Sequence, residues 1–174
     1  MSYPKPENEL ERLEFLHSLS LLDTAKDENL ERIVSVCRLV FDMPIADISV
    51  IDGDRQWFKS MQGLGICETD RELAFCNYPV ATGQPLEVLD ALTHPDFKDN
   101  AVVTGEPFIR YYFGVPIFLD GFAIGALCLI DTKPREALSD NGRETMKQFG
   151  QMVERELKIQ RVLRSAVSRL PNVD

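Results

Sequence analysis

Cysteine and histidine are the residues of this sequence best suited to covalent or metal chemistry. The chain has four cysteines and two histidines, which are Cys37, Cys67, Cys76, Cys128, His17 and His94. Structural zinc sites use closely spaced Cys or His pairs, and the sequence has neither a CxxC pair nor a Cys/His cluster. Neither histidine lies in a motif typical of a catalytic triad, and no G-x-S-x-G, Walker or H-E-x-x-H pattern is present. The sequence therefore predicts no metal site, no cofactor and no catalytic residue.

Cys67 and Cys76 flank one charged turn and are the cysteines we consider for thiol redox chemistry. A reactive cysteine needs a thiolate that is stabilised by a cationic neighbour. Arg71 is the nearest cation in the sequence, but three acidic residues surround it. We therefore expect a protein that is not an enzyme and keep a thiol-based reductase as the alternative.

Aromatic and charged residues in the middle of the chain are candidates for the lining of a ligand pocket. These candidates are Trp57, Phe75, Cys76, Tyr78, Asp90, Arg110, Tyr111 and Tyr112. Each also has a structural interpretation, because aromatic rings pack in cores and Arg110 can form an ion pair with Asp90 or Glu106. Tyr111 and Tyr112 are neighbours in a predicted strand, so their side chains point to opposite faces. One of the two faces the pocket side, and the sequence does not say which.

The elements that must position these residues are strands flanked by helices. Segments rich in β-branched and apolar residues predict strands at 45–52, 55–61, 111–119 and 122–131, with a short one at 86–91. Asp120-Gly121 is a strong hairpin signal between the last two long strands. These two strands are apolar at both sets of alternating positions, with Ile124 grouped with Ala126 and Cys128 on one face. A strand of this kind is buried on both faces.

Helical periodicity predicts the layer that covers one face of this sheet. Apolar residues recur at helical spacing over 7–19 and again in a second helix that Asp23 or Thr24 would cap and that ends before Pro44. The irregular segment Gly63–Arg110 remains to cover the other face. Antiparallel hairpins between terminal helices indicate an α+β fold. A sheet covered by irregular chain on one face is a natural place for a ligand cavity.

The predicted helix over Ser139–Leu170 is longer than one small domain can cover. About 30 residues at about 1.5 Å each make a helix of about 45 Å. Its first apolar stripe suits the domain core, and a second one includes Val162 and Leu163. We expect its last third to project and to pair with a second copy in a homodimer or with a downstream output domain. Pro171 would end the helix.

Charge and composition limit the partners of the chain. The 174 residues carry a formal net charge of −9, and the sequence pI is about 4.8. An acidic domain of this size repels phosphate backbones and anionic lipid surfaces, so we expect neither nucleic-acid nor membrane binding. No segment approaches the roughly 20 apolar residues of a membrane span, and the N-terminus does not read as a secretory signal. We expect a cytoplasmic location with reduced thiols.

Several motifs, taken in order, resemble those of a subfamily of GAF domains in bacterial signalling proteins. They are LLDT (21–24), DRQWFKS (54–60), FC (75–76), VTGEPFIRYYFGVPI (103–117) and IGALCLIDTKPR (124–135). The resemblance implies a central antiparallel sheet of five or six strands, with terminal helices on one face and a pocket-covering segment on the other. The resemblance covers a GAF domain over 9–154, and we expect a flexible N-terminus over 1–8 and an extension of the last helix over 155–174.

What the resemblance implies about function is a sensory or regulatory module that binds a small molecule or mediates dimerisation. Members bind cyclic nucleotides, tetrapyrroles or other small molecules, and some have no known ligand. The subfamily commonly has FCAH where this chain reads Phe75-Cys76-Asn77-Tyr78, so no histidine role carries over. The Cys-His pair of bilin-binding relatives and an NKxDE-type signature are absent. Free-methionine sulfoxide reductases are GAF enzymes, so the reductase alternative is an enzyme of that type. A ligand-free protein-interaction domain is the third possibility.

Overall fold

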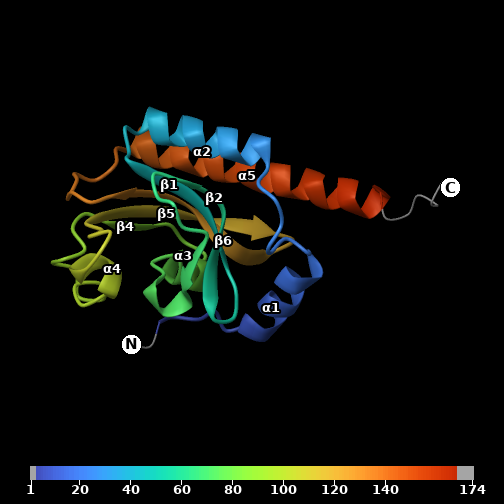
Figure 1. The fold of residues 1–174 in the computed structure, drawn as a ribbon, viewed down its shortest axis with the longest axis horizontal. Coiled ribbons are helices and arrows are strands. Elements are labelled where there is room, and N and C mark those ends of the chain that lie inside the picture. The colour runs from blue at the N-terminus through green and yellow to red at the C-terminus, as the bar shows by residue number, and fades with distance from the viewer. Residues whose placement is uncertain (1–2, 168–174) are drawn as a thin grey trace.

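The structure is a computed structural model that describes residues 3–167 (Figure 1). Its elements in chain order are α1 (Glu9–Ser18), α2 (Glu28–Val40), β1 (Ile45–Ile51), β2 (Arg55–Gln62), β3 (Glu68–Asp70), the 3-10 helix η1 (Arg71–Leu73), α3 (Asn77–Thr82), β4 (Leu86–Val88), α4 (Ala101–Thr104), β5 (Tyr111–Leu119), β6 (Phe122–Asp131) and α5 (Asp140–Val167). The predicted helix end at Leu170 and the stop at Pro171 lie outside the described residues.

Six strands form one sheet in the order β3-β2-β1-β6-β5-β4, and every neighbouring pair is antiparallel. The predicted strands and the α+β class are confirmed, and the sequence missed only the short edge strand β3. Asp120 and Gly121 join β5 to β6 with positive φ angles of 47° and 88°. Both central residues of the two-residue turn that suits a twisted hairpin need positive φ, which explains this Asp-Gly pair.

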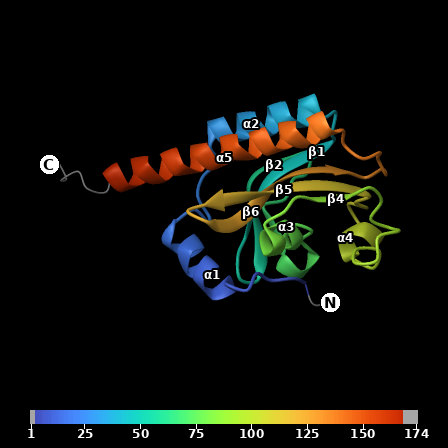
Figure 2. The ribbon, with the colours of Figure 1, turned by 180° about the vertical axis from the view of Figure 1, so that it is seen from behind.

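α2 and α5 lie side by side on one face of the sheet (Figures 1 and 2). Leu30, Val34 and Cys37 of α2 and Met146 and Val153 of α5 are buried there in one core cluster. α1 adds its buried Leu16 to the same cluster. The prediction that terminal helices cover one face is confirmed for α2 and α5, whereas α1 lies beside the hairpin of β1 and β2, where Arg12 Nη1 donates to Ile51 O at 2.8 Å (Figure 1). Ser139 caps α5, since its Oγ accepts a hydrogen bond from Gly142 N at 3.1 Å.

The predicted cap of α2 was wrong. The capping residue is Asp27, whose side chain accepts hydrogen bonds from the backbone N–H groups of Asn29 and Leu30. Asp23 instead has a positive φ of 59° and pairs with Arg55 of β2, with Nη2 and Oδ2 2.7 Å apart. Asp23, which the local sequence predicted as a helix cap, thus forms a long-range ion pair instead.

The second face of the sheet is covered by the segment between β2 and β5, including α3 and α4 (Figure 2). Buried residues of this segment, among them Phe75, Val80, Phe97 and Ile109, form a second core cluster with the sheet. The sheet therefore lies between two apolar layers, as the two-sided pattern of its central strands predicted.

A β-bulge corrects the predicted faces of β6. Ile117 pairs with Gly125 and the next residue, Phe118, pairs with Ala123, so Ile124 is the extra residue. Ile124 is buried in the helix-side core, whereas Ala123, Ala126 and Cys128 belong to the cluster on the other face. A bulge shifts the alternation of side chains by one position, which strict period-two reasoning does not anticipate. Within the described part of the chain, no helix is long and apolar enough to cross a membrane.

Candidate ligand cavity

A cavity of about 50 Å³ lies between the sheet and the segment that covers its second face. Strands β1, β2, β5 and β6 contribute its floor, and residues between 64 and 109 contribute its cover. Most lining side chains are apolar, including Phe58, Met61, Phe75, Ile109 and Ile130. The polar lining residues are Asp47, Gln56, Thr69, Cys76 and Tyr112. This volume has room for a few water molecules or a small chemical group, but not for a nucleotide.

Two thiols, a phenol and a hydroxyl meet beside the cavity, and Cys76 and Tyr112 of this cluster line it. Cys76 Sγ lies 3.3 Å from Cys128 Sγ. Ser49 Oγ donates to Cys76 Sγ at 3.0 Å, and Tyr112 Oη donates to it at 3.3 Å. Tyr112 Oη also lies 3.5 Å from Cys128 Sγ. Four side chains from β1, β5, β6 and the start of α3 therefore form one buried polar cluster.

The two thiols of this cluster differ in acidity. Burial raises the pKa of Cys128 well above its usual value, and the contact with Cys76 raises it further. Burial also acts against ionisation of Cys76, but the hydrogen bonds from Cys128, Ser49 and Tyr112 together lower its pKa. Cys76 is thus the thiol that loses a proton first.

Backbone geometry explains why Tyr112 reaches this cluster. The phenol ring of Tyr112 lies along its own strand over Gly114, where a Cβ atom would overlap the Tyr112 hydroxyl. Only glycine leaves this space, so Gly114 and Tyr112 act as a pair that directs the phenol toward the thiols.

Asp47 is the least expected residue of the cavity. It lies on β1 opposite Cys128 of β6, and its side chain is only 1% exposed. Among the described residues, neither carboxyl oxygen has a hydrogen-bond partner. Burial raises the pKa of Asp47 well above its usual value, and the nearby Cys76 adds to this effect, whereas the adjacent Cys128 thiol and Ser49 hydroxyl, as hydrogen-bonding neighbours, lower it by less than burial raises it. The carboxyl group therefore stays protonated to a higher pH than an exposed one.

Two of the sequence-predicted pocket residues face away from the cavity. Trp57 and Tyr111 are both buried in the helix-side core cluster. Tyr111 Oη donates to Glu87 Oε1 at 2.9 Å, and the same oxygen accepts from Leu138 N before α5. Strand alternation alone did not tell which of Tyr111 and Tyr112 faces the cavity. The structure places Tyr112 on the cavity side.

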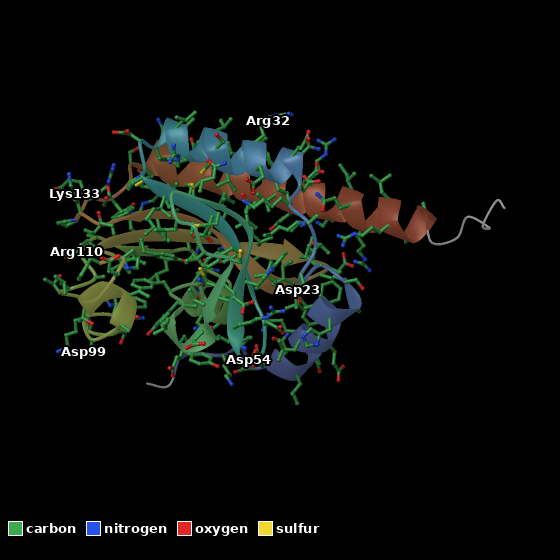
Figure 3. The ribbon with its side chains drawn as sticks, viewed as in Figure 1. Asp23, Arg32, Asp54, Asp99, Arg110 and Lys133 are labelled. Carbon is green, nitrogen blue, oxygen red and sulfur yellow. The ribbon has the colours of Figure 1, made fainter. Side chains whose placement is uncertain are left out.

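Asp90, Arg110 and Tyr78 lie outside the cavity lining. Arg110 makes two hydrogen bonds of 2.7 Å to the two carboxylate oxygens of Asp90, so the ion-pair interpretation holds. Figure 3 shows Arg110 at the periphery of the molecule. Tyr78 packs edge-on against Phe97, with ring centroids 4.9 Å apart, and lines a separate surface depression. Of the eight candidates, Phe75, Cys76 and Tyr112 line the cavity.

Sequence reasoning missed Asp47, Ser49, Gln56 and Cys128. Asp47 and Ser49 alternate with apolar residues in the segment IADISVID, which places both on one face of a buried strand. That pattern was the available signal. Within residues 3–167, no group of three or more His, Cys, Asp or Glu side chains is arranged to hold a metal ion.

The raised pKa of Asp47 predicts how stability depends on pH. The folded chain keeps a proton on Asp47 at pH values where the unfolded chain, with an Asp pKa of about 3.9, has lost it. Stability therefore falls as pH rises from about 4 toward the folded-state pKa, by up to about 1.4 kcal/mol per pH unit. Asn does not titrate, so urea unfolding should show the gain in stability of Asp47→Asn over the wild type growing across this range.

Asp90→Asn is the matched control for this measurement. The ion pair with Arg110 lowers the pKa of Asp90, so its contribution has the opposite sign and is lost as pH falls. A stability difference for Asp47→Asn that does not change with pH would contradict the buried, unpartnered state of this carboxyl group.

One curated relative is similar to most of the chain. A cyclic di-GMP phosphodiesterase from Pseudomonas aeruginosa is 39% identical over 151 residues, which cover 86% of this chain and 26% of that protein. The chain thus spans about a quarter of the length of the curated relative it matches.

Solved structures share the fold at low sequence identity. A free methionine-R-sulfoxide reductase from Neisseria meningitidis aligns with a TM-score of 0.63 at 20% identity, covering 94% of this chain and 98% of that one. The GAF domain of an Acinetobacter phosphoenolpyruvate-protein phosphotransferase aligns with a TM-score of 0.59 at 15% identity, covering 92% and 97%. The family model described as the GAF domain matches residues 24–157. On the agreement of motifs, sheet order and this match, the chain belongs to the GAF domain family.

Proposed function

We propose that this chain is a regulatory module of a cytoplasmic signal-transduction protein. Its cavity takes a small molecule, and its C-terminal helix passes the occupied or empty state to an output domain. The observation that carries this proposal is the similarity to a phosphodiesterase of which the chain matches only about a quarter. Such a partial match is typical of a module joined to other parts, and cyclic di-GMP hydrolysis is our proposal for the output.

The surface of α5 supports pairing with a second copy. The 28-residue helix is about 42 Å long, and Figure 1 shows its C-terminal part extending beyond the sheet. Met152, Ile159, Val162 and Leu163 are exposed on it by between 42% and 65%. Their spacing of seven and then three or four residues is that of a coiled-coil seam. A parallel pair of these helices would bury the stripe and connect two output domains.

The α5 stripe predicts the oligomeric state. We expect the chain to be a dimer in light scattering, and the double variant Val162→Glu/Leu163→Glu to be a monomer with an unchanged circular dichroism spectrum, because like charges then face each other across the seam. Lys147→Glu changes the net charge equally at an exposed position off the stripe and should leave the dimer intact. A wild-type chain that is monomeric at high concentration would contradict this role of the helix.

Regulation of an output domain can be tested in a hybrid protein. The chain would replace the aligned part of the Pseudomonas aeruginosa phosphodiesterase, and cyclic di-GMP hydrolysis would be measured. We expect Val162→Glu/Leu163→Glu in the hybrid to change the rate of cyclic di-GMP hydrolysis several-fold relative to Lys147→Glu. Equal rates in both hybrids, and in the phosphodiesterase lacking the module, would rule out signalling through α5.

The second candidate function is a thiol reductase of the free-methionine sulfoxide type. From the sequence, Cys67 and Cys76 are the cysteines that we consider for this chemistry. In the structure Cys67 is exposed and Cys76 lies beside Cys128, so the reductase would use Cys76 and Cys128. In the balanced reaction, methionine sulfoxide and the two thiols give methionine, one disulfide and water.

Reductase activity is tested with free methionine sulfoxide and dithiothreitol as the recycling reductant. If this function holds, Cys76→Ser abolishes methionine formation and Cys67→Ser leaves it unchanged. Absence of turnover by the wild-type chain, or full turnover by Cys76→Ser, would eliminate the candidate.

A further inference from the structure

The polar atoms of the cavity without partners indicate the chemistry of a ligand. Asp47 Oδ1, Asp47 Oδ2 and Gln56 Oε1 have no hydrogen-bond partner among the described residues. Their side chains are only 1% and 8% exposed, so bulk water does not compensate them. With Asp47 ionised, all three atoms are hydrogen-bond acceptors.

Two donors that line the same cavity point at groups other than Asp47. Tyr112 Oη donates to Cys76 Sγ at 3.3 Å and lies 3.5 Å from Cys128 Sγ. Gln56 Nε2 lies 3.5 Å from Thr69 Oγ1. Once Asp47 is ionised, no donor among the described lining residues is hydrogen-bonded to its two oxygens or to Gln56 Oε1, and a ligand that supplies a donor relieves the cost of burying these acceptors.

Charge narrows the ligand class further. No lysine, arginine or histidine is among the residues that line the cavity, whereas Asp47 is an acid within it. An anion such as a phosphate or carboxylate would meet no cation and one buried carboxyl group. A cation would supply the countercharge that an ionised Asp47 lacks.

Size and access set the remaining limits. The cavity of about 50 Å³ suits a molecule of few heavy atoms, and its walls near Asp47 include Met61, which pairs with Asp47 across β1 and β2. Ile66 lines the cavity and is 41% exposed, which places an opening beside the loop between β2 and β3. An apolar body with one charged end matches this combination of walls and floor.

Building on the proposed regulatory function, we propose that the cavity binds a small aliphatic amine. Binding releases the proton of Asp47 to solvent, so that the ammonium group donates to a carboxylate, and the apolar body packs among Phe58, Met61 and Ile130. Asp47 is the residue that determines specificity, and the surrounding apolar side chains exclude larger or more polar amines.

Three probes of matched shape test this inference on the 174-residue chain by NMR titration of backbone amide signals. Isobutylamine, isobutanol and isobutyrate share one branched apolar body and differ in carrying a cation, a neutral hydroxyl and an anion. We expect isobutylamine to bind at least about tenfold more tightly than isobutanol, because its hydrogen bond is charge-assisted. Isobutyrate should not bind. The shifted amides should lie on β1, β2 and the loop between β2 and β3.

Asp47→Asn separates the role of this carboxyl group from that of the cavity. It keeps the size of the side chain and removes its charge, so the preference for the amine over the alcohol should disappear. Asp90→Asn, which removes a carboxylate outside the cavity, should leave the preference unchanged. If Asp47→Asn does not fold, the order of the three probes on the wild-type chain still decides the question.

Three outcomes would overturn the inference. They are equal binding of amine and alcohol, an amine preference that survives Asp47→Asn, and shifts by none of the probes, which would leave the cavity with water only. The proposed function fails separately, since the dimer and the hybrid phosphodiesterase are measured without any amine. A dimeric module that regulates its output but ignores isobutylamine would keep that function and refute this ligand class.

Discussion

The pairing of β1 with β6, buried on both faces, is the constraint on which the rest of the structure depends. Apolar side chains leave both faces of these central strands, so each face needs a cover of its own. Helices α2 and α5 supply one cover, to which α1 adds Leu16, and the segment between β2 and β5 supplies the other. Asp47, the one ionisable side chain of β1, then lies beneath that second cover, and burying its carboxyl group without a hydrogen-bond partner among the described residues destabilises the fold.

Local signals explain why so much of the fold was predictable from the sequence. The Asp120-Gly121 turn, the β-branched runs and the helical stripes each depend on residues within one segment, and all were confirmed. The missed features depend on partners far away in the chain. The bulge at Ile124 follows from register against β5, and Asp23 leaves the helix cap because Arg55 of another element pairs with it.

The candidate site was predictable only in part for the same reason. Phe75, Cys76 and Tyr112 were among the candidates that line the cavity, whereas Trp57 and Tyr111, which are also aromatic residues of predicted strands, face the helices. The side that an aromatic residue of a two-sided strand occupies is set by sheet register, which the sequence does not state. Asp47 was overlooked because a carboxylate without a partner becomes visible only when burial and neighbours are known.

The sheet of this GAF domain lies between the cavity and the long C-terminal helix. A small cavity on one face of the sheet and a long helix on the other are connected through strands that contribute to both cores. Because Tyr111 and Tyr112 are adjacent, the strand that holds the phenol over the thiols also anchors the start of α5 through Glu87. A ligand that shifts β5 would therefore act on both layers.

The protonation state of Asp47 tests the central claim most directly, and carboxyl carbon NMR of the free protein measures it. We predict a carbon signal that stays at the position of a protonated carboxyl group to well above pH 4 in the absence of ligand. A signal that titrates near the ordinary Asp value of about 3.9 would show that the group is hydrated or paired. Asp47 would then already have a partner in the free protein, and the ligand inference, which depends on an unpartnered carboxyl group, would fail.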